Sequence, residues 1–174
     1  MLRAALAVTV TVLVALSVPA DAADRKGDLA LGFSSQDAPV GIRYFTTDET
    51  AVDLGLGLES MDVPVDGGET ESITNFFVEG GFTYVVYDRD DSFFFVRPAI
   101  AFASFDDLSP NGLENRIRGE LNLGAEVRLA DHFGLTFEHG LIVQSDSPQG
   151  DGDSMTTVRT FGENVTRAGV WYNF

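Results

Sequence analysis

The stretch NRIRGELNLGAEVR, residues 115–128, decides the fold of this chain. Its large apolar residues, Ile117, Leu121, Leu123 and Val127, have odd numbers, whereas all of its charged residues have even numbers. Because successive side chains of a β-strand point to opposite faces, this segment is expected to form a strand with one apolar face and one charged face.

The same alternation recurs in seven further segments, separated by clusters of Asp, Asn, Gly, Pro and Ser that are typical of turns. The expected strands span residues 28–35, 39–46, 51–60, 74–87, 93–104, 115–128, 133–143 and 158–174. Most connections alternate between short turns, at 47–50, 88–92 and 129–132, and long loops, at 61–73, 105–114 and 144–157. This pattern predicts an all-β, antiparallel up-and-down meander with short turns at one end and long loops at the other.

The composition excludes several classes of function. The chain has 174 residues, enough for one domain, and contains no cysteine, which excludes disulfide scaffolds, zinc ribbons and cysteine nucleophiles. Its net charge of −16 excludes a nucleic-acid partner, because an acidic chain repels phosphates. Ten of the eleven basic residues are arginine, an unusual choice for a solvated surface. No cofactor and no metal site is predicted.

Residues 1–22 have the pattern of a cleaved secretory signal peptide. Arg3 precedes an uncharged apolar run over residues 4–18, and Ala20-Asp21-Ala22 has the small-x-small form of a cleavage site. The run is shorter than the roughly 20 residues that a membrane-spanning helix needs. The sequence therefore predicts an export signal over residues 1–22 and a barrel domain over residues 23–174.

Two architectures, each the inside-out version of the other, fit the alternating strands. In a soluble ligand-binding barrel the apolar face forms the core, whereas in a transmembrane barrel it meets lipid and the charged face lines the interior. Glycine is frequent on the charged face, which suits the crowded interior of an eight-stranded barrel, and that face carries arginine but no lysine. Aromatic residues also lie near the ends of the apolar faces, as in interfacial girdles. We therefore expect an eight-stranded antiparallel up-and-down transmembrane β-barrel with short periplasmic turns and longer external loops.

The charged residues of the polar face are expected to pair inside the barrel. Eight strands leave an interior that side chains just fill, and an unpaired charge is costly in a low-dielectric interior. The predicted lumenal ion-pair network consists of Arg43, Asp53, Glu79, Arg97, Arg116, Arg118, Glu120, Glu126, Arg128, Glu138 and Arg167. A small-solute channel along these charges stays open as an alternative.

The chain ends in Val170-Trp171-Tyr172-Asn173-Phe174, with apolar or aromatic residues alternating back from a terminal phenylalanine. This ending resembles the closing-strand signature of Gram-negative outer-membrane β-barrel proteins. The export signal, the eight strands and the alternating connections resemble the small barrels of the opacity/adhesion and outer-membrane protein A or X type. The resemblance implies an outer-membrane location, contact with its lipids and lipopolysaccharide, and recognition of Val170, Tyr172 and Phe174 by the barrel-assembly machinery.

The three long loops together contain ten acidic residues and no lysine or arginine. One interpretation is a divalent-cation site in the last loop, with Asp146, Asp151 and Asp153 as candidate ligands, because Ca²⁺ prefers several carboxylate and carbonyl oxygens. The favoured interpretation is a solvated acidic surface.

His139 has the apolar parity of its strand, and some eight-stranded barrels are lipid A deacylases with a lipid-facing histidine. Their pattern has a serine two residues after the histidine, where this chain has Leu141, and Ser145 would lie about 20 Å from His139 along a strand. Enzymatic activity is therefore not predicted. The expected function is a monomeric barrel with a structural, adhesive or envelope-interaction role carried by its acidic external loops. A small-solute channel, a deacylase-like enzyme using His139 and a soluble periplasmic ligand-binding barrel are the alternatives.

Overall fold

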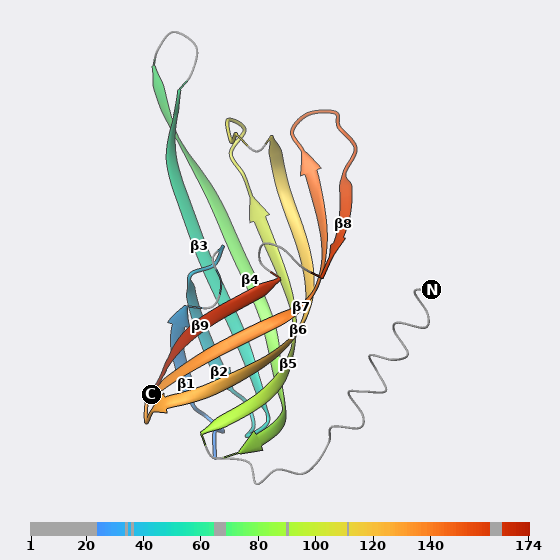
Figure 1. The fold of residues 1–174 in the computed structure, drawn as a ribbon. Coiled ribbons are helices and arrows are strands. Elements are labelled where there is room, and N and C mark those ends of the chain that lie inside the picture. The colour runs from blue at the N-terminus through green and yellow to red at the C-terminus, as the bar shows by residue number, and fades with distance from the viewer. Residues whose placement is uncertain are drawn as a thin grey trace, which may run out of the picture.

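The computed structural model describes residues 24–33, 35, 37–64, 69–89, 91–110, 112–160 and 165–174, and these form an all-β structure (Figure 1). Across these ranges no helix is long and apolar enough to cross a membrane. The expected signal peptide, residues 1–22, lies outside the described residues. The strands are β1 (Leu29–Phe33), β2 (Val40–Phe45), β3 (Thr50–Pro64), β4 (Thr70–Arg89), β5 (Ser92–Ser104), β6 (Leu113–Ala130), β7 (Phe133–Pro148), β8 (Met155–Arg159) and β9 (Thr166–Asn173).

The strands close into a barrel. From β1 to β7 each strand pairs antiparallel with the next, and β9 completes the circle by pairing with both β7 and β1. Eight strands therefore surround the interior, and β8 is an additional strand that pairs with β7 beyond the end of β9. The prediction of an eight-stranded antiparallel up-and-down barrel is confirmed.

The expected last strand, residues 158–174, was wrong as a single element. β9 pairs with the start of β7, up to the pair His139–Thr166, and β8 pairs with the later part of β7, from the pair Ile142–Arg159. Three residue steps along β7, from 139 to 142, thus correspond to seven steps along its partner, from 159 to 166. The ladder on β7 is therefore interrupted between the pairs His139–Thr166 and Ile142–Arg159, and one predicted strand becomes two.

The barrel wall has very unequal height (Figure 1). β3, β4, β6 and β7 contain 15 to 20 residues, whereas β1 contains 5 and β2 contains 6. The expected long loops 61–73 and 144–157 are wrong over most of their length, because β3 extends to Pro64, β4 begins at Thr70 and β7 extends to Pro148. In these extensions the outward residues other than Pro64 are polar, so the backbone ladder continues where the apolar alternation ends.

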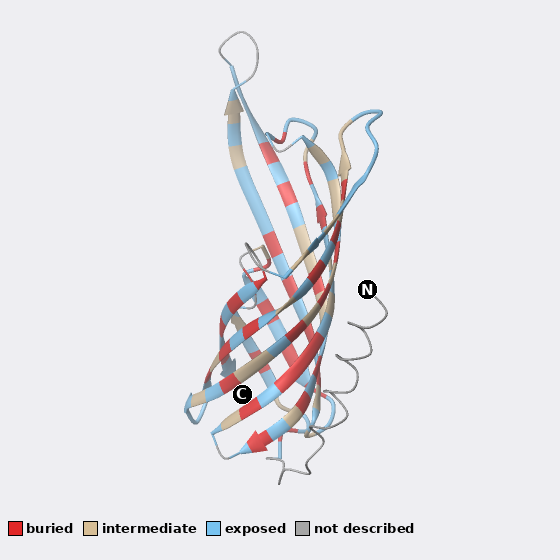
Figure 2. Ribbon diagram, turned by 45° about the vertical axis from the view of Figure 1, so that its right-hand side comes forward, coloured by how far each residue is buried: buried red, intermediate tan, exposed pale blue. Residues whose placement is uncertain are grey.

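Burial alternates along most of the length of the eight wall strands and gives the direction of their two faces (Figure 2). In β2, for example, Gly41, Arg43 and Phe45 are buried, while Val40, Ile42 and Tyr44 are exposed. Most large apolar residues of the alternating segments point away from the interior, and Arg43 is 1% exposed. The charged face therefore lines the barrel.

A register shift between β4 and β5 changes which residues of β4 face the interior. The β4–β5 register shifts between Val85 and Tyr87, and the shift changes which parity faces inward, so that Asp88 is buried. Pro98 pairs in regular register with Leu121 and is exposed on the outer face.

Candidate functional site

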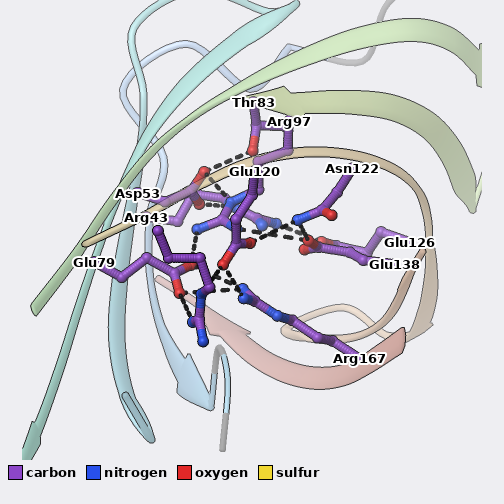
Figure 3. A network of polar contacts seen from close by, with 11 residues as sticks. Arg43, Asp53, Glu79, Thr83, Arg97, Glu120, Asn122, Glu126, Glu138 and Arg167 are labelled. Atoms are coloured by element: carbon purple, nitrogen blue, oxygen red, sulfur yellow. Dashed lines mark hydrogen bonds and ion pairs between the residues drawn. The ribbon is translucent and has the colours of Figure 1, made fainter. Parts of the chain in front are cut away.

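The middle of the barrel is filled by charged side chains that converge from seven of the eight wall strands (Figure 3). Each side chain lies at an inward position of its strand and is 8% exposed or less. The group consists of Arg43, Asp53, Glu79, Arg97, Arg118, Glu120, Glu126, Glu138 and Arg167. We call these nine residues the lumenal network.

Arg97 on β5 joins three carboxylates of the lumenal network. Its Nη2 donates to Glu79 Oε1 at 2.6 Å, its Nε donates to Asp53 Oδ2 at 3.3 Å, and its Nη1 lies 3.6 Å from Glu138 Oε2. The Thr83 hydroxyl also donates to Asp53 Oδ2, at 2.6 Å. Arg97 therefore links strands β3, β4, β5 and β7 across the interior.

Arg167 makes the corresponding link from the closing strand. It contacts Glu79 Oε1 at 3.0 Å and Glu120 Oε1 at 2.5 Å, and Arg118 Nε donates to the same Glu120 oxygen at 2.5 Å. Arg43 bridges Asp53 (2.5 Å) and Glu126 (2.7 Å). These charge-assisted bonds hold the wall together from inside.

Glycine makes room for these long side chains. A Cβ at Gly81 would lie 2.7 Å from Arg97 Nη2, and a Cβ at Gly124 would lie 2.3 Å from the Phe95 ring. An alanine at either position would displace the lumenal side chain opposite it.

The turn end of the barrel is closed by aromatic side chains beneath the lumenal network. Phe45, Phe93 and Phe95 form a buried cluster with Ala51 and Val85. The guanidinium of Arg25 lies 4.5 Å from the centre of the Phe93 ring and forms two hydrogen bonds to Asp88, of 2.8 and 2.7 Å. This arginine, contributed by the segment before β1, covers the aromatic cluster.

At the loop end, described residues of two connections contact inward side chains of the wall. Asp37, in the β1–β2 connection, accepts a hydrogen bond from Arg118 Nη1 at 2.8 Å, and the lumenal cavity beside it measures about 10 Å³. Phe105, just after β5, packs edge-on against Phe77, and Asp106 N donates to Asn75 Oδ1 at 3.2 Å. A cavity of that volume holds about one water molecule.

Two of the eleven residues predicted for the network lie elsewhere. Arg116 is part-exposed near the loop end, where its Nε donates to Asp146 Oδ1 at 2.6 Å. Arg128 is half-buried near the turn end and forms no ion pair with a described residue. Both have inward parity, but they lie beyond the level at which the other nine meet. Sequence reasoning missed Arg25, Asp88 and Asp37, which lie outside the expected alternation or after the register shift.

The candidate cation ligands do not come together. Asp146 lies at an inward position of β7, where it accepts hydrogen bonds from Arg116 and Gln144, whereas Asp151 and Asp153 are exposed. Among the described residues no group of three His, Cys, Asp or Glu side chains could hold a metal ion.

The predicted assembly signal lies on the outer face of β9 and at its end. Val170, Tyr172 and Phe174 are exposed, and the Tyr172 ring contacts Phe133 (5.1 Å) and Phe174 (5.0 Å) edge-on. Trp171, between them, points inward and is 2% exposed.

His139 lies on the outer face with its Nδ1 2.8 Å from Thr166 Oγ1. Ser145, considered above as its partner, pairs instead with Thr156 of β8.

Comparison of the chain with protein-family models, with curated proteins and with solved structures finds no significant match in any of the three.

Proposed function

We propose that this protein is an integral outer-membrane barrel, closed to solutes, with a structural or envelope-interaction role carried by its external hairpins. The observation that carries the proposal is a continuous outer belt of exposed apolar side chains around a charged, ion-paired interior. Soluble monomers rarely expose apolar patches larger than a few hundred Å². Lipid is the solvent that matches such a belt, and a closed barrel satisfies every backbone group within it.

The belt ends abruptly toward the loops. The outward pair Leu58–Phe76 of β3 and β4 is followed, two residues further, by the outward pair Ser60–Thr74. On β5 and β6 the pair Phe102–Ile117 is likewise followed by Ser104–Asn115. Neighbouring strands thus change from apolar to polar at matching positions, as expected at the surface of a bilayer.

Toward the turns the belt ends in aromatic residues. All four tyrosines of the chain, Tyr44, Tyr84, Tyr87 and Tyr172, are exposed near this end, as are Phe133 and Phe174. Tyrosine favours the membrane–water interface because its ring is apolar and its hydroxyl reaches water.

The height of the belt also fits a bilayer. On β7 the belt runs from Phe133 to Val143. These ten residue steps, at about 3.3 Å each and a tilt of about 40°, span about 25 Å, which is the height of the apolar band of outer-membrane barrels.

The interior argues for a role other than transport. The lumenal network, the aromatic cluster below it and the inward-folded connections above it fill the barrel. Contacts with outside partners therefore fall to the loop end, where the β3–β4 and β7–β8 hairpins rise above the rest of the wall (Figure 1) and carry an excess of acidic residues.

The test is a pair of charge substitutions on the outer face of β3. Leu54→Arg places a charge within the belt, and Ser60→Arg places the same charge two residues beyond the end of the belt. We expect Leu54→Arg to abolish or strongly reduce insertion into liposomes, and Ser60→Arg to insert like wild type, because a mid-bilayer arginine costs about 2–4 kcal/mol. Insertion is followed by flotation with the vesicles and by the heat-dependent gel mobility of a closed barrel. Equal behaviour of the two variants, or a wild-type protein that stays soluble without detergent, would exclude the membrane assignment, and single-channel conductance would exclude the closed lumen.

A further inference from the structure

The barrel wall is incomplete above the short β1–β2 hairpin. β2 pairs with β3 only as far as the pair Val40–Leu56, whereas β3 continues to Pro64. Residues 57–64 therefore pair with β4 on one side and with no described strand on the other. In Figure 1 the upper part of the β3–β4 hairpin rises above β1 and β2, while at its foot Asp37 and Pro39 of the β1–β2 connection lie beside Leu58 and Glu59.

The free edge is a regular strand. The β3–β4 register runs from the pair Thr50–Tyr84 to the pair Pro64–Thr70 without a shift. Exposed edges are usually protected by bulges, charged side chains or proline. Along residues 57–64 there is no bulge, proline occurs only at the far end, and the charges, Glu59 and Asp62, are both negative, so they oppose pairing with an acidic or uncharged strand more than pairing with a basic one. Unpaired N–H and C=O groups of a regular edge can accept a further strand.

A pocket of about 210 Å³ lies at the foot of the free edge. It is lined by Asp37, Pro39, Leu58, Glu59 and Phe77. Asp37 is bound to Arg118 on one side yet keeps 27% of its side chain exposed, and Glu59 is exposed while one of its oxygens accepts from Asn75 at 3.0 Å. Two carboxylates beside an aromatic ring suit an alkylammonium or guanidinium group, which gains both ion pairing and a cation–π contact.

The charge of the hairpin selects the partner. Residues 57–78 contain five acidic residues and no lysine or arginine. The edge of β8, across the gap, carries Arg159 instead. An incoming strand with positive side chains is therefore attracted to the β3 edge, and an acidic strand is repelled.

We propose that residues 57–64 of β3 bind a basic, extended segment of a partner protein as an added β-strand, with one Lys or Arg side chain of that segment in the pocket beside Glu59. The inference rests on the proposed function in one respect, since the edge beyond Leu58, the last residue of the belt on β3, must stand outside the bilayer. The backbone ladder supplies affinity, and the pocket and the acidic residues supply selectivity.

The experiment uses the mature chain refolded in detergent micelles and fluorescently labelled nine-residue peptides at low salt. One peptide alternates lysine and threonine, a second replaces each lysine by glutamate, and a third repeats the first with alternate backbone amides N-methylated. We expect the lysine peptide to bind, and the glutamate and N-methylated peptides to bind at least tenfold more weakly. Hydrogen exchange of the backbone amides should slow within residues 57–64 when the lysine peptide is added.

A matched pair of variants separates this edge from general acidity. Glu59→Gln/Asp62→Asn removes two charges at the edge, and Glu114→Gln/Asp153→Asn removes two exposed charges elsewhere at the loop end. The first should weaken the lysine peptide by about two- to tenfold, in line with two exposed ion pairs, and the second should leave binding nearly unchanged. Absence of binding, equal binding of the three peptides, equal loss in the two variants, or protection outside residues 57–64 would each overturn the proposal. Liposome insertion of the same preparation tests the proposed function separately, because a barrel that inserts without binding the peptide overturns this inference alone.

Discussion

Replacing Arg97 by methionine should destabilise the barrel far more than any comparable change at its surface. Arg97 is buried and contacts three carboxylates, at 2.6, 3.3 and 3.6 Å. Without it Asp53 keeps Arg43 and Glu79 keeps Arg167, but Glu138 keeps only the Asn122 amide, at 3.3 Å, among its described partners. Removing one partner of a buried ion pair costs about 3–5 kcal/mol because the other charge stays buried and uncompensated.

The charge count of the lumenal network makes the effect asymmetric. The network contains four arginines and five carboxylates, so it already has an excess of negative charge. Loss of an arginine enlarges this excess, whereas Glu138→Gln removes one charge and keeps an oxygen for Asn122. We therefore expect Glu138→Gln to change the free energy of unfolding by less than about 1 kcal/mol, and to recover about half of the loss when combined with Arg97→Met.

The assay is urea unfolding of the micelle-refolded protein, followed by the fluorescence of Trp171. This residue is the only tryptophan of the chain, it is buried, and its ring lies 4.3 Å from the guanidinium of Arg43. Arg128→Met is the matched control, because Arg128 forms no ion pair with a described residue and should cost no more than about 0.5 kcal/mol. An Arg97→Met loss below 1 kcal/mol, or one equal to that of Arg128→Met, would refute the account of the network as a structural cross-link.

Three further substitutions test the ends of the barrel. Arg25→Ala should lower the free energy of unfolding by about 3 kcal/mol through loss of the buried pair with Asp88, while Lys26→Ala, at an exposed neighbour, should leave the urea midpoint unchanged. Gly57→Ala should displace Asp37 and Ala38 of the β1–β2 connection, because the added Cβ would meet the backbone of Asp37. Gly80→Ala is the control, because its Cβ would have no atom within 4 Å. With Ala38→Cys added to both variants, maleimide should label the cysteine faster in the Gly57→Ala protein than in the Gly80→Ala protein. Phe174→Ala should reduce the heat-modifiable fraction in cell envelopes several-fold. In micelles it should change the free energy of unfolding by less than about 1 kcal/mol, because Phe174 is 65% exposed. Equal assembly of Phe174→Ala and wild type would show that Phe174 is not part of the assembly signal.

Parity was sufficient to predict most of the interior. Once a strand has period two, one buried position determines the face of every other residue, so Arg43, Asp53 and Glu79 could be assigned together although they lie on different strands. Parity does not give height along the barrel axis. That is why Arg116 and Arg128, with the same parity as Arg118, lie above and below the level at which the network meets.

The ends of the barrel could not be predicted by the same argument. Phe93 and Phe95 flank the outward Phe94, and from sequence an aromatic residue near a strand end suits an interfacial girdle as well as a lumenal cluster. The register shift at Val85–Tyr87 turns Asp88 inward, and no residue of this segment predicts the position of such a shift. Asp37 reaches Arg118 from a connection, where no periodicity operates.

The distribution of charge links the closed interior to the proposed interaction surface. In the proposed membrane barrel the wall that meets lipid has to be nearly free of charge, and the side-chain-filled interior has to be close to neutral, so neither can carry a net charge of −16. The excess must therefore gather at the ends, and the three expected long loops alone contain ten acidic residues without a basic one. Because β1 and β2 are short, part of this acidic end is a bare strand edge rather than a flexible loop. The negative electrostatic field of the acidic end attracts cationic partners in general. The spacing of N–H and C=O groups along residues 57–64 restricts strand addition to partners that can adopt an extended conformation.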